Sequence, residues 1–168
     1  MTTQLDLAYI AGLVDGEAYI GIKKSKAYKC QGRQTPGYHA RIQVRMVDEA
    51  AIRFLAETLG GWYYKEKPNT HKGRDLFCYQ ASDLQAKNIL SALVPYLRVK
   101  KRNAQAVLAL RFLQQDARKY KTRITGYRNF PNKYGTPRKV PNLAFCQPYV
   151  DLCETLYQHC KSLNAGTI

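Results

Sequence analysis

The chain of 168 residues is long enough for one domain with a sizeable core, and its hydrophobic share of 45% argues against an intrinsically disordered protein. Lys and Arg total 27 against 12 Asp and Glu, which gives a formal net charge of +15. This excess predicts a polyanionic partner, and 13 tyrosines add aromatic faces among the basic residues. Charge alone does not separate a DNA enzyme from a structural RNA binder.

Hydrophobic periodicity and turn residues divide the first two thirds of the chain into helices and paired strands. In chain order they predict a helix over 5–15, strands over 17–26 and 38–46, a helix from Asp48 to Gly60, strands over 62–67 and 75–81, and helices over 83–93 and 100–115. The polar turn at 27–37 and the basic loop at 68–74 each join two strands into a hairpin. This order predicts an α+β domain with αββαββα topology.

The remainder of the chain, from about residue 118, differs in composition from the first two thirds. Lys, Arg, Tyr, Gly and Pro are interleaved over 118–142, which fits either an ordered DNA-contacting loop or a flexible basic linker. A helix is predicted over 145–163, where Cys146, Cys153 and Cys160 recur every seventh residue as an apolar stripe. The five cysteines include no CxxC pair, so we expect a reducing intracellular compartment, without distinguishing a bacterial cytoplasm from an organelle matrix.

Small residues and two acids mark the end of the first helix. Ala8, Gly12 and Gly16 are four apart, so they share one helix face along which another backbone can approach closely. Asp15 and Glu17 follow where the partial negative charge of the helix dipole disfavours acids. A metal ion or donors from a partner would explain the acids, whereas a plain helix end would explain only Gly16 as a C′ residue. The segment by itself leaves both interpretations open.

The stretch Ile10 to Ala18, IAGLVDGEA, resembles the nine-residue LAGLIDADG motif of the homing endonucleases. Ile stands in its first position, Glu replaces its second acid and Ala its final Gly. A second stretch over 95–104, PYLRVKKRNA, resembles the basic segment of the homodimeric, single-motif members. The resemblance covers roughly residues 5–115, and no second copy of the motif occurs.

The length and the predicted elements together give a single domain over 1–168, with a core at about 5–115 that carries the resemblance, a basic loop at about 118–142 and a C-terminal helix at about 145–163. An antiparallel β saddle would sit on DNA, with the helices packed behind it. The implied activity is site-specific, divalent-metal-dependent double-strand cleavage of a long pseudo-palindromic DNA target by a homodimer, in the setting of intron or intein mobility. An RNA maturase and a catalytically inactive DNA-binding regulator on the same fold are the alternatives.

The resemblance also assigns roles to individual residues. Glu17 and Lys100 are the expected catalytic residues, and Glu17 with the Gly16 carbonyl is expected to hold Mg²⁺. Mn²⁺ is expected to substitute, and Ca²⁺ to bind without supporting cleavage. The expected dimer interface consists of Ala8, Gly12, Asp15 and Gly16. Met46 replaces the polar pocket residue that follows the second strand in related enzymes. Neither a membrane nor an organic cofactor is expected.

The strands supply the expected DNA-binding surface. Their apolar faces must pack on helices, which leaves a positively charged face that can enter the major groove and read base edges. The residues expected to contact DNA there are Lys23, Ser25, His39, Arg41, Gln43, Arg45, Tyr63, Lys65, Lys67, Phe77 and Tyr79. Lys101 and Arg102, at the start of a helix whose dipole disfavours cations, are expected to hold phosphate.

Overall fold

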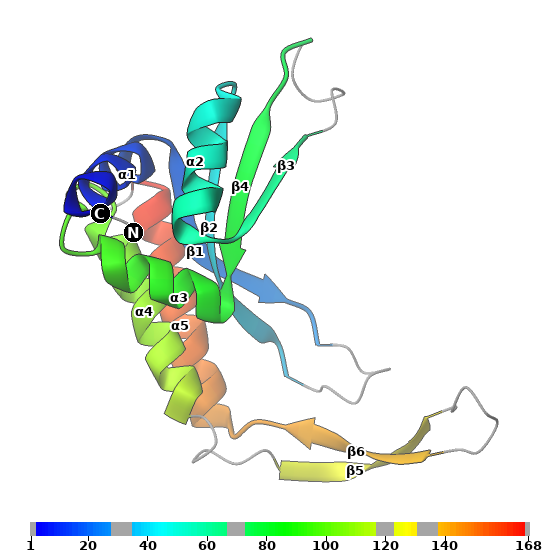
Figure 1. The fold of residues 1–168 in the computed structure, drawn as a ribbon. Coiled ribbons are helices and arrows are strands. Elements are labelled where there is room, and N and C mark those ends of the chain that lie inside the picture. Colours follow the sequence, from blue (N-terminus) through cyan, green and yellow to red (C-terminus); the bar gives the residue numbers. More distant parts are fainter. Residues whose placement is uncertain (1–2, 28–34, 67–72, 117–122, 131–137, 167–168) are drawn as a thin grey trace.

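A computed structural model of the chain describes residues 3–27, 35–66, 73–116, 123–130 and 138–166. Figure 1 shows the order of its elements. They are α1 (Gln4–Glu17), β1 (Ala18–Ser25), β2 (Gly37–Met46), α2 (Glu49–Leu59), β3 (Trp62–Lys65), β4 (Phe77–Ser82), α3 (Asp83–Leu93), α4 (Lys101–Asp116), β5 (Arg123–Phe130), β6 (Arg138–Ala144) and α5 (Gln147–Asn164). The αββαββα order predicted from the sequence is confirmed for the first seven elements, and the helix predicted over 100–115 follows as α4.

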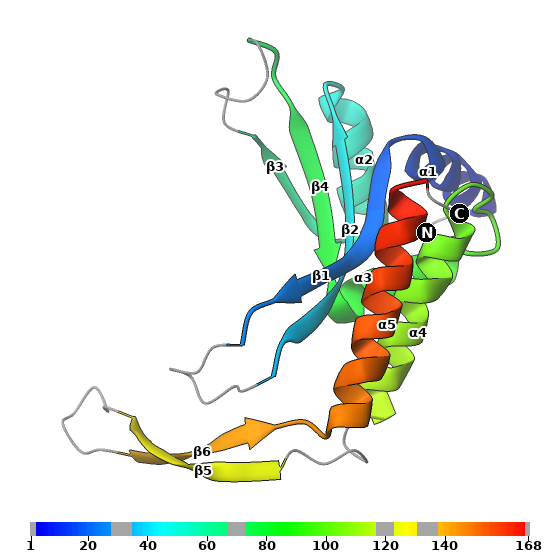
Figure 2. The ribbon, with the colours of Figure 1, turned by 180° about the vertical axis from the view of Figure 1, so that it is seen from behind.

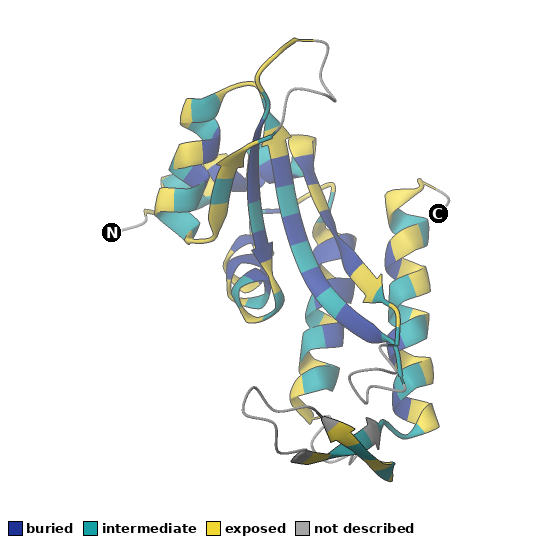
Figure 3. Cartoon of the chain, turned by 90° about the vertical axis from the view of Figure 1, so that its right-hand side faces the viewer, coloured by how far each residue is buried: buried dark blue, intermediate teal, exposed yellow. Residues whose placement is uncertain are grey.

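Four strands form one antiparallel sheet in the order β1-β2-β4-β3. The register pairs Ala18 with Val44, Arg41 with Ser82, and Tyr63 with Tyr79. Helices cover one face of this sheet, and the other face is uncovered (Figure 3). We call the uncovered side the open face. The predicted α+β saddle with its helices behind is therefore the observed arrangement.

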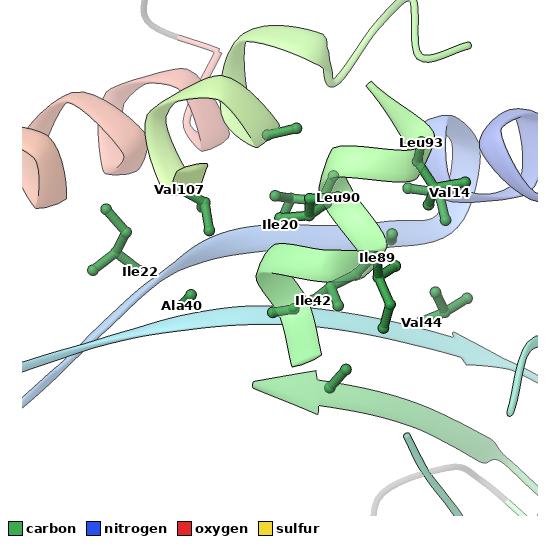
Figure 4. Close-up of a cluster of buried hydrophobic side chains, with 14 of the residues drawn as sticks. Val14, Ile20, Ile22, Ala40, Ile42, Val44, Ile89, Leu90, Leu93 and Val107 are labelled. Carbon is green, nitrogen blue, oxygen red and sulfur yellow. The ribbon is translucent and has the colours of Figure 1, made fainter. Parts of the chain in front are cut away.

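The core lies between the covered face of the sheet and the helices (Figure 4). Ile42 and Val44 of β2 are fully buried there, against α3. Ala86, Ile89, Leu90 and Leu93 of α3 are all buried, and their spacing of three and four residues is that of one helix face. Burying each large aliphatic side chain contributes about 1.5–3 kcal/mol before entropy is counted. This packing fixes the sheet on which the candidate site is built.

The helix α5 packs on α4 and along β1 (Figure 2). Cys153 and Cys160 are buried free thiols, as expected for the apolar stripe predicted in this helix. The amide of Asn164 donates a hydrogen bond to the carbonyl oxygen of Ile20 (3.0 Å), which ties the end of α5 to β1. No helix of the described residues is long and apolar enough to cross a membrane.

Part of the segment expected to be a loop over 118–142 is instead an antiparallel hairpin. β5 pairs with β6 from Arg123 opposite Ala144 to Phe130 opposite Arg138, with a register shift between Ile124 and Gly126. The sequence conceals these strands because their β-forming residues are interleaved with Gly, Pro and basic side chains. Residues 118–122 and 131–137 of the predicted loop lie outside the described residues.

Candidate functional site

The first helix delivers its two acids to one end of the sheet. α1 begins with a capping box between Thr3 and Asp6 and ends at Glu17. The next residue, Ala18, is buried and opens β1. The Glu17 side chain is exposed, and within the described residues no hydrogen bond or ion pair engages its carboxylate. Glu17 is therefore available to a ligand outside the chain.

Asp15 is engaged within the chain. Its Oδ2 accepts hydrogen bonds from the backbone N–H groups of Arg98 (2.7 Å) and Val99 (3.2 Å), and its Oδ1 accepts one from Lys100 N–H (2.8 Å). These groups directly precede α4, so the carboxylate occupies the position of an anion at a helix N-terminus. One side chain thus joins the end of α1 to the start of α4.

These bonds also decide the ionisation of Asp15. Burial raises the pKa of its carboxyl, but the backbone bonds from Arg98, Lys100 and Val99 together outweigh burial and hold the pKa below its ordinary value. Neither a metal ion nor a partner chain is therefore needed to explain an acid at this helix end, and the predicted place of Asp15 in a dimer interface stays a prediction. The donors come from the same chain, from a segment 83 residues later in the sequence.

Lys100 makes the reciprocal contact. Its ammonium donates to the carbonyl oxygens of Val14 (3.2 Å) and Gly16 (3.3 Å), in the last turn of α1. A cation is favoured there, because the C-terminal carbonyls carry partial negative charge. Partial burial lowers the pKa of Lys100, while Asp15 and Glu17 act to raise it. The position of Lys100 is thus explained by α1 and does not require a bound phosphate.

Lys101 and Arg102 are exposed in the first turn of α4. The positive end of the helix dipole and the cationic side chains act in the same direction there, so this turn attracts anions. Their predicted role in holding phosphate remains a prediction that fits their placement.

The oxygen atoms next to Lys100 determine which ligands this chain could offer a metal ion. Mg²⁺ takes oxygen ligands and commonly keeps several waters or binds substrate phosphates. The Glu17 carboxylate and the Gly16 carbonyl are such donors, but the Lys100 ammonium already contacts that carbonyl. Among the described residues no cluster of three His, Cys, Asp or Glu forms a metal site. These donors could hold an ion through few protein oxygens, and the remaining ligands would have to come from outside the chain.

The small-residue face of α1 is bare in this single chain. Ala8, Gly12 and Gly16 are exposed, and a Cβ atom added at either glycine would meet nothing within 4 Å. Beside this face lies a hollow of about 670 Å³ lined by Ala8, Gly12, Asp15, Pro95, Tyr96, Leu97, Arg98 and Lys101. Within the described residues no contact requires glycine at positions 12 and 16, so the predicted role of this face in a dimer interface is consistent with the fold.

Polar side chains of β1 and β2 line the open face, as predicted. His39, Arg41, Gln43 and Arg45 alternate with buried residues of β2, and Lys23 and Ser25 follow on β1. Several are already held within the chain. Arg41 donates to the Gln80 amide oxygen (2.5 Å), Arg45 Nε lies 2.8 Å from Glu66, and His39 Nδ1 lies 3.1 Å from Asp83.

The prediction that the second hairpin, β3 with β4, contacts DNA through the predicted side chains is wrong, because those that the structure describes lie on the covered side of the sheet. Phe77 and Tyr79 are buried on the covered side of β4, and the Tyr79 hydroxyl donates to the Gly60 carbonyl (2.8 Å). Tyr63 and Lys65 pair directly opposite them, so they share that side. Neither pair lies on the open face. Lys67 lies outside the described residues.

The open face of this hairpin is instead formed by the alternate residues. Register places Trp62 and Tyr64 of β3 beside Gln80 and Cys78 of β4, with Ser82 beyond them. The Trp62 side chain is 74% exposed, a large apolar area to leave in water. For β4 the sequence did indicate which face is buried, because Phe77, Tyr79 and Ala81 alternate with polar residues and an apolar face packs inward. β3 offers no such contrast, since both of its faces carry tyrosine.

Met46 closes β2 opposite Phe77. It is half-buried and packs against the hydrophobic core, on the covered side of the sheet. The side chain in this place therefore contributes to packing, and it brings no polar group towards Glu17.

No protein-family model and no curated protein matches the sequence. Solved structures do match. The homing endonuclease I-CvuI, in complex with the I-CreI target and 2 mM Mg, is similar over 95% of this chain and 82% of that chain, with a TM-score of 0.63 and 18% identity. I-CvuI with its own target and Ca gives a TM-score of 0.55 and 22% identity over 68% of this chain and 71% of that chain.

The archaeal intron-encoded enzyme I-Vdi141I, complexed with DNA, is similar over 67% of this chain and 70% of that chain, with a TM-score of 0.54 and 16% identity. I-SmaMI, a LAGLIDADG homing endonuclease bound to cleaved DNA, has a TM-score of 0.54 and 14% identity, and the match covers 66% of this chain but 37% of that one. The chain thus has the fold of the LAGLIDADG homing endonucleases.

Proposed function

We propose that this protein is a homodimeric, divalent-metal-dependent endonuclease that cleaves both strands of a specific DNA site. The observation that carries the proposal is the exposed Glu17 carboxylate beside the Lys100 ammonium, at the end of a sheet whose open face is basic and uncovered. The DNA complexes of I-CvuI and I-Vdi141I support DNA as the partner, since this chain shares their fold.

Each residue of the site has a task in this proposal. The Glu17 carboxylate and the Gly16 carbonyl would hold Mg²⁺, which when bound would supply charge neutralisation at a DNA phosphate and activation of a water. Lys100 places a second positive charge at the same phosphate. Asp15 is a positioning residue, because it fixes the backbone from which Lys100 projects. The open face of the sheet holds the duplex and reads its major groove through residues such as Arg41 and Gln43.

The small-residue face supports two copies per site. One chain offers one exposed acid at the end of α1, whereas double-strand cleavage needs an acid for each strand. Packing Ala8, Gly12 and Gly16 against the same face of a second chain would bring the two Glu17 residues to the dyad.

A cleavage selection from a random duplex library tests the proposal. Incubation with Mg²⁺ should enrich one pseudo-palindromic site, and EDTA or Glu17→Gln should abolish the cleavage. Binding of a selected site without cleavage in Mg²⁺ or Mn²⁺ would instead identify an inactive DNA-binding regulator. Stimulation of intron splicing, with neither DNA cleavage nor site-specific DNA binding, would identify an RNA maturase.

A further inference from the structure

The hairpin formed by β5 and β6 has no task in the function proposed above. It is inserted between α4 and α5, and its two strands contact each other along their length. In the described part of the chain neither strand packs extensively on a helix or on the main sheet. A two-stranded hairpin without such packing is marginally stable in water. A surface supplied by a ligand would stabilise it.

The charge of this region selects the kind of ligand. Between Asp116 and Asp151 the sequence contains eight Lys or Arg residues and no Asp or Glu. Arg123, Arg128, Arg138 and Lys139 belong to the two strands themselves. A hairpin with this charge balance is complementary to a polyanion and repels basic surfaces, including a second copy of this chain.

One face of the hairpin combines charge with exposed aromatic area. The register pairs Tyr127 with Pro141 and Asn129 with Lys139, so these four residues share a face. Tyr127 is 65% exposed, and both Asn129 and Lys139 are exposed. A tyrosine, an amide and an ammonium are donors of the kind that contact phosphate and sugar oxygens of nucleic acid.

The position of the hairpin relates this face to the proposed DNA path. Figures 1 and 2 both place it past the ends of β1 and β2 that are farthest from α1, and it extends in the same direction as those two strands. Figure 3, which looks at the open face, shows the hairpin below the sheet and on the viewer's side of the helices. Since Glu17 marks the cleavage point at the other end of β1, the hairpin lies on the outer side of each half-site.

We infer that the β5–β6 hairpin is a second DNA-binding element, which holds the phosphate backbone of the duplex flanking the part covered by the sheet. This inference rests on the proposed function for the placement of the duplex. An eight-residue strand spans roughly 26 Å, which corresponds to about seven or eight base pairs of duplex length. The hairpin lengthens the footprint of each half-site without reading its sequence.

Salt dependence of binding to random-sequence duplex DNA tests the inference without requiring cleavage. Each phosphate contact contributes about 0.9 to the slope of log K against log salt concentration. Lys139→Gln should lower the slope by about two units, since the homodimer carries one Lys139 on each half-site, and replacing residues 123–144 by a Gly/Ser linker should lower it further. Lys87→Gln is the matched control, because it removes the same charge from α3, where Lys87 lies over the Phe112 ring and contacts Gln115. It should leave the slope unchanged.

Duplex length gives the second measurement. Wild-type affinity for the selected target should fall when the flanks are trimmed, whereas the linker variant should bind long and trimmed duplexes equally. The selected base preferences of the two proteins should be the same. Circular dichroism and the Mg²⁺-dependent cleavage of the trimmed target by the linker variant establish that it has folded.

Equal salt slopes for wild type and the linker variant would overturn the inference, as would a changed base preference in the linker variant. A loss of affinity confined to RNA of the same length would overturn it in favour of an RNA-binding hairpin. Failure of the proposed function can be told apart from failure of this inference. In the first case wild-type protein would cut no site in Mg²⁺, while its salt slope on duplex DNA can still be compared with that of the linker variant.

Discussion

Asp15 and Lys100 each stabilise the end of the other's helix. The Asp15 carboxylate accepts the backbone N–H of Lys100 and of the two residues before it, at the start of α4. The Lys100 ammonium donates to carbonyl oxygens in the last turn of α1. An acid lies at a helix N-terminus and a base at a helix C-terminus, which is the favourable arrangement for both dipoles. The two helix ends that carry the candidate site are thereby locked together.

The first prediction concerns the stability supplied by Asp15. Asp15→Ala should lower the free energy of unfolding by about 1–2 kcal/mol, because the backbone groups preceding α4 lose their acceptor. The folded pKa of Asp15 lies below its ordinary value of 3.8, so its contribution is present above that pH and is lost as the pH falls through the lowered pKa. Urea unfolding of wild type and variant should differ at neutral pH, and the difference should shrink in acid. A constant difference would contradict the assignment.

The second prediction separates chemistry from stability at Glu17. Glu17→Gln keeps the shape of the side chain and should lower cleavage by about 10²–10³-fold or more, since a principal electrostatic contribution is lost. Because Glu17 is exposed and makes no hydrogen bond within the described residues, the free energy of unfolding should change by less than about 0.5 kcal/mol. Target binding should persist. Near-normal cleavage by the folded variant would remove Glu17 from the catalytic site.

The acid pair illustrates what the sequence could and could not predict. The small-residue face, the two acids and the basic segment over 95–104 were all recognisable, and so was the order of strands and helices. The hydrogen-bond donors to Asp15 could not be recognised, because they lie far away in the sequence and only the fold brings Arg98 to α1. The face of the second hairpin was predicted wrongly, although the alternation of Phe77 and Tyr79 with polar residues indicated that they point inward. The β5–β6 hairpin lacked a periodic apolar pattern, since it has little core to face.

The third prediction concerns assembly through α1. Gly12→Leu should abolish the dimer, because the leucine side chain would occupy the face that a second chain needs. The monomer itself should lose no stability, since a Cβ at Gly12 meets nothing within 4 Å and glycine is a poor helix former. Analytical ultracentrifugation and urea unfolding together test this. A wild-type monomer that still makes double-strand breaks would refute the dimer model.

The fourth prediction concerns base readout by the open face. Arg41→Ala should relax the preference at particular base pairs, because Arg41 lies among the polar residues of that face, whereas Lys101→Ala should weaken binding to all sequences equally. Tyr79→Phe is a control on the covered side. It removes the hydrogen bond to Gly60, so it should lower stability without altering the preferred bases. Uniform effects of Arg41→Ala across sequences would contradict readout by β2.

The last prediction concerns Lys100 in catalysis. Lys100→Met keeps the aliphatic stem and removes the charge beside Gly16 and Glu17. If Lys100 acts on the transition state, the single-turnover rate of the saturated complex should fall far more than affinity does. Lys101→Met is the matched control, since Lys101 is exposed one residue further along and should affect affinity alone. Lys100→Met also removes a donor to Val14, so the rate must be measured where urea unfolding shows the variant to be folded. An unchanged single-turnover rate would mean that Lys100 holds the helix ends and the DNA in place without taking part in the chemical step.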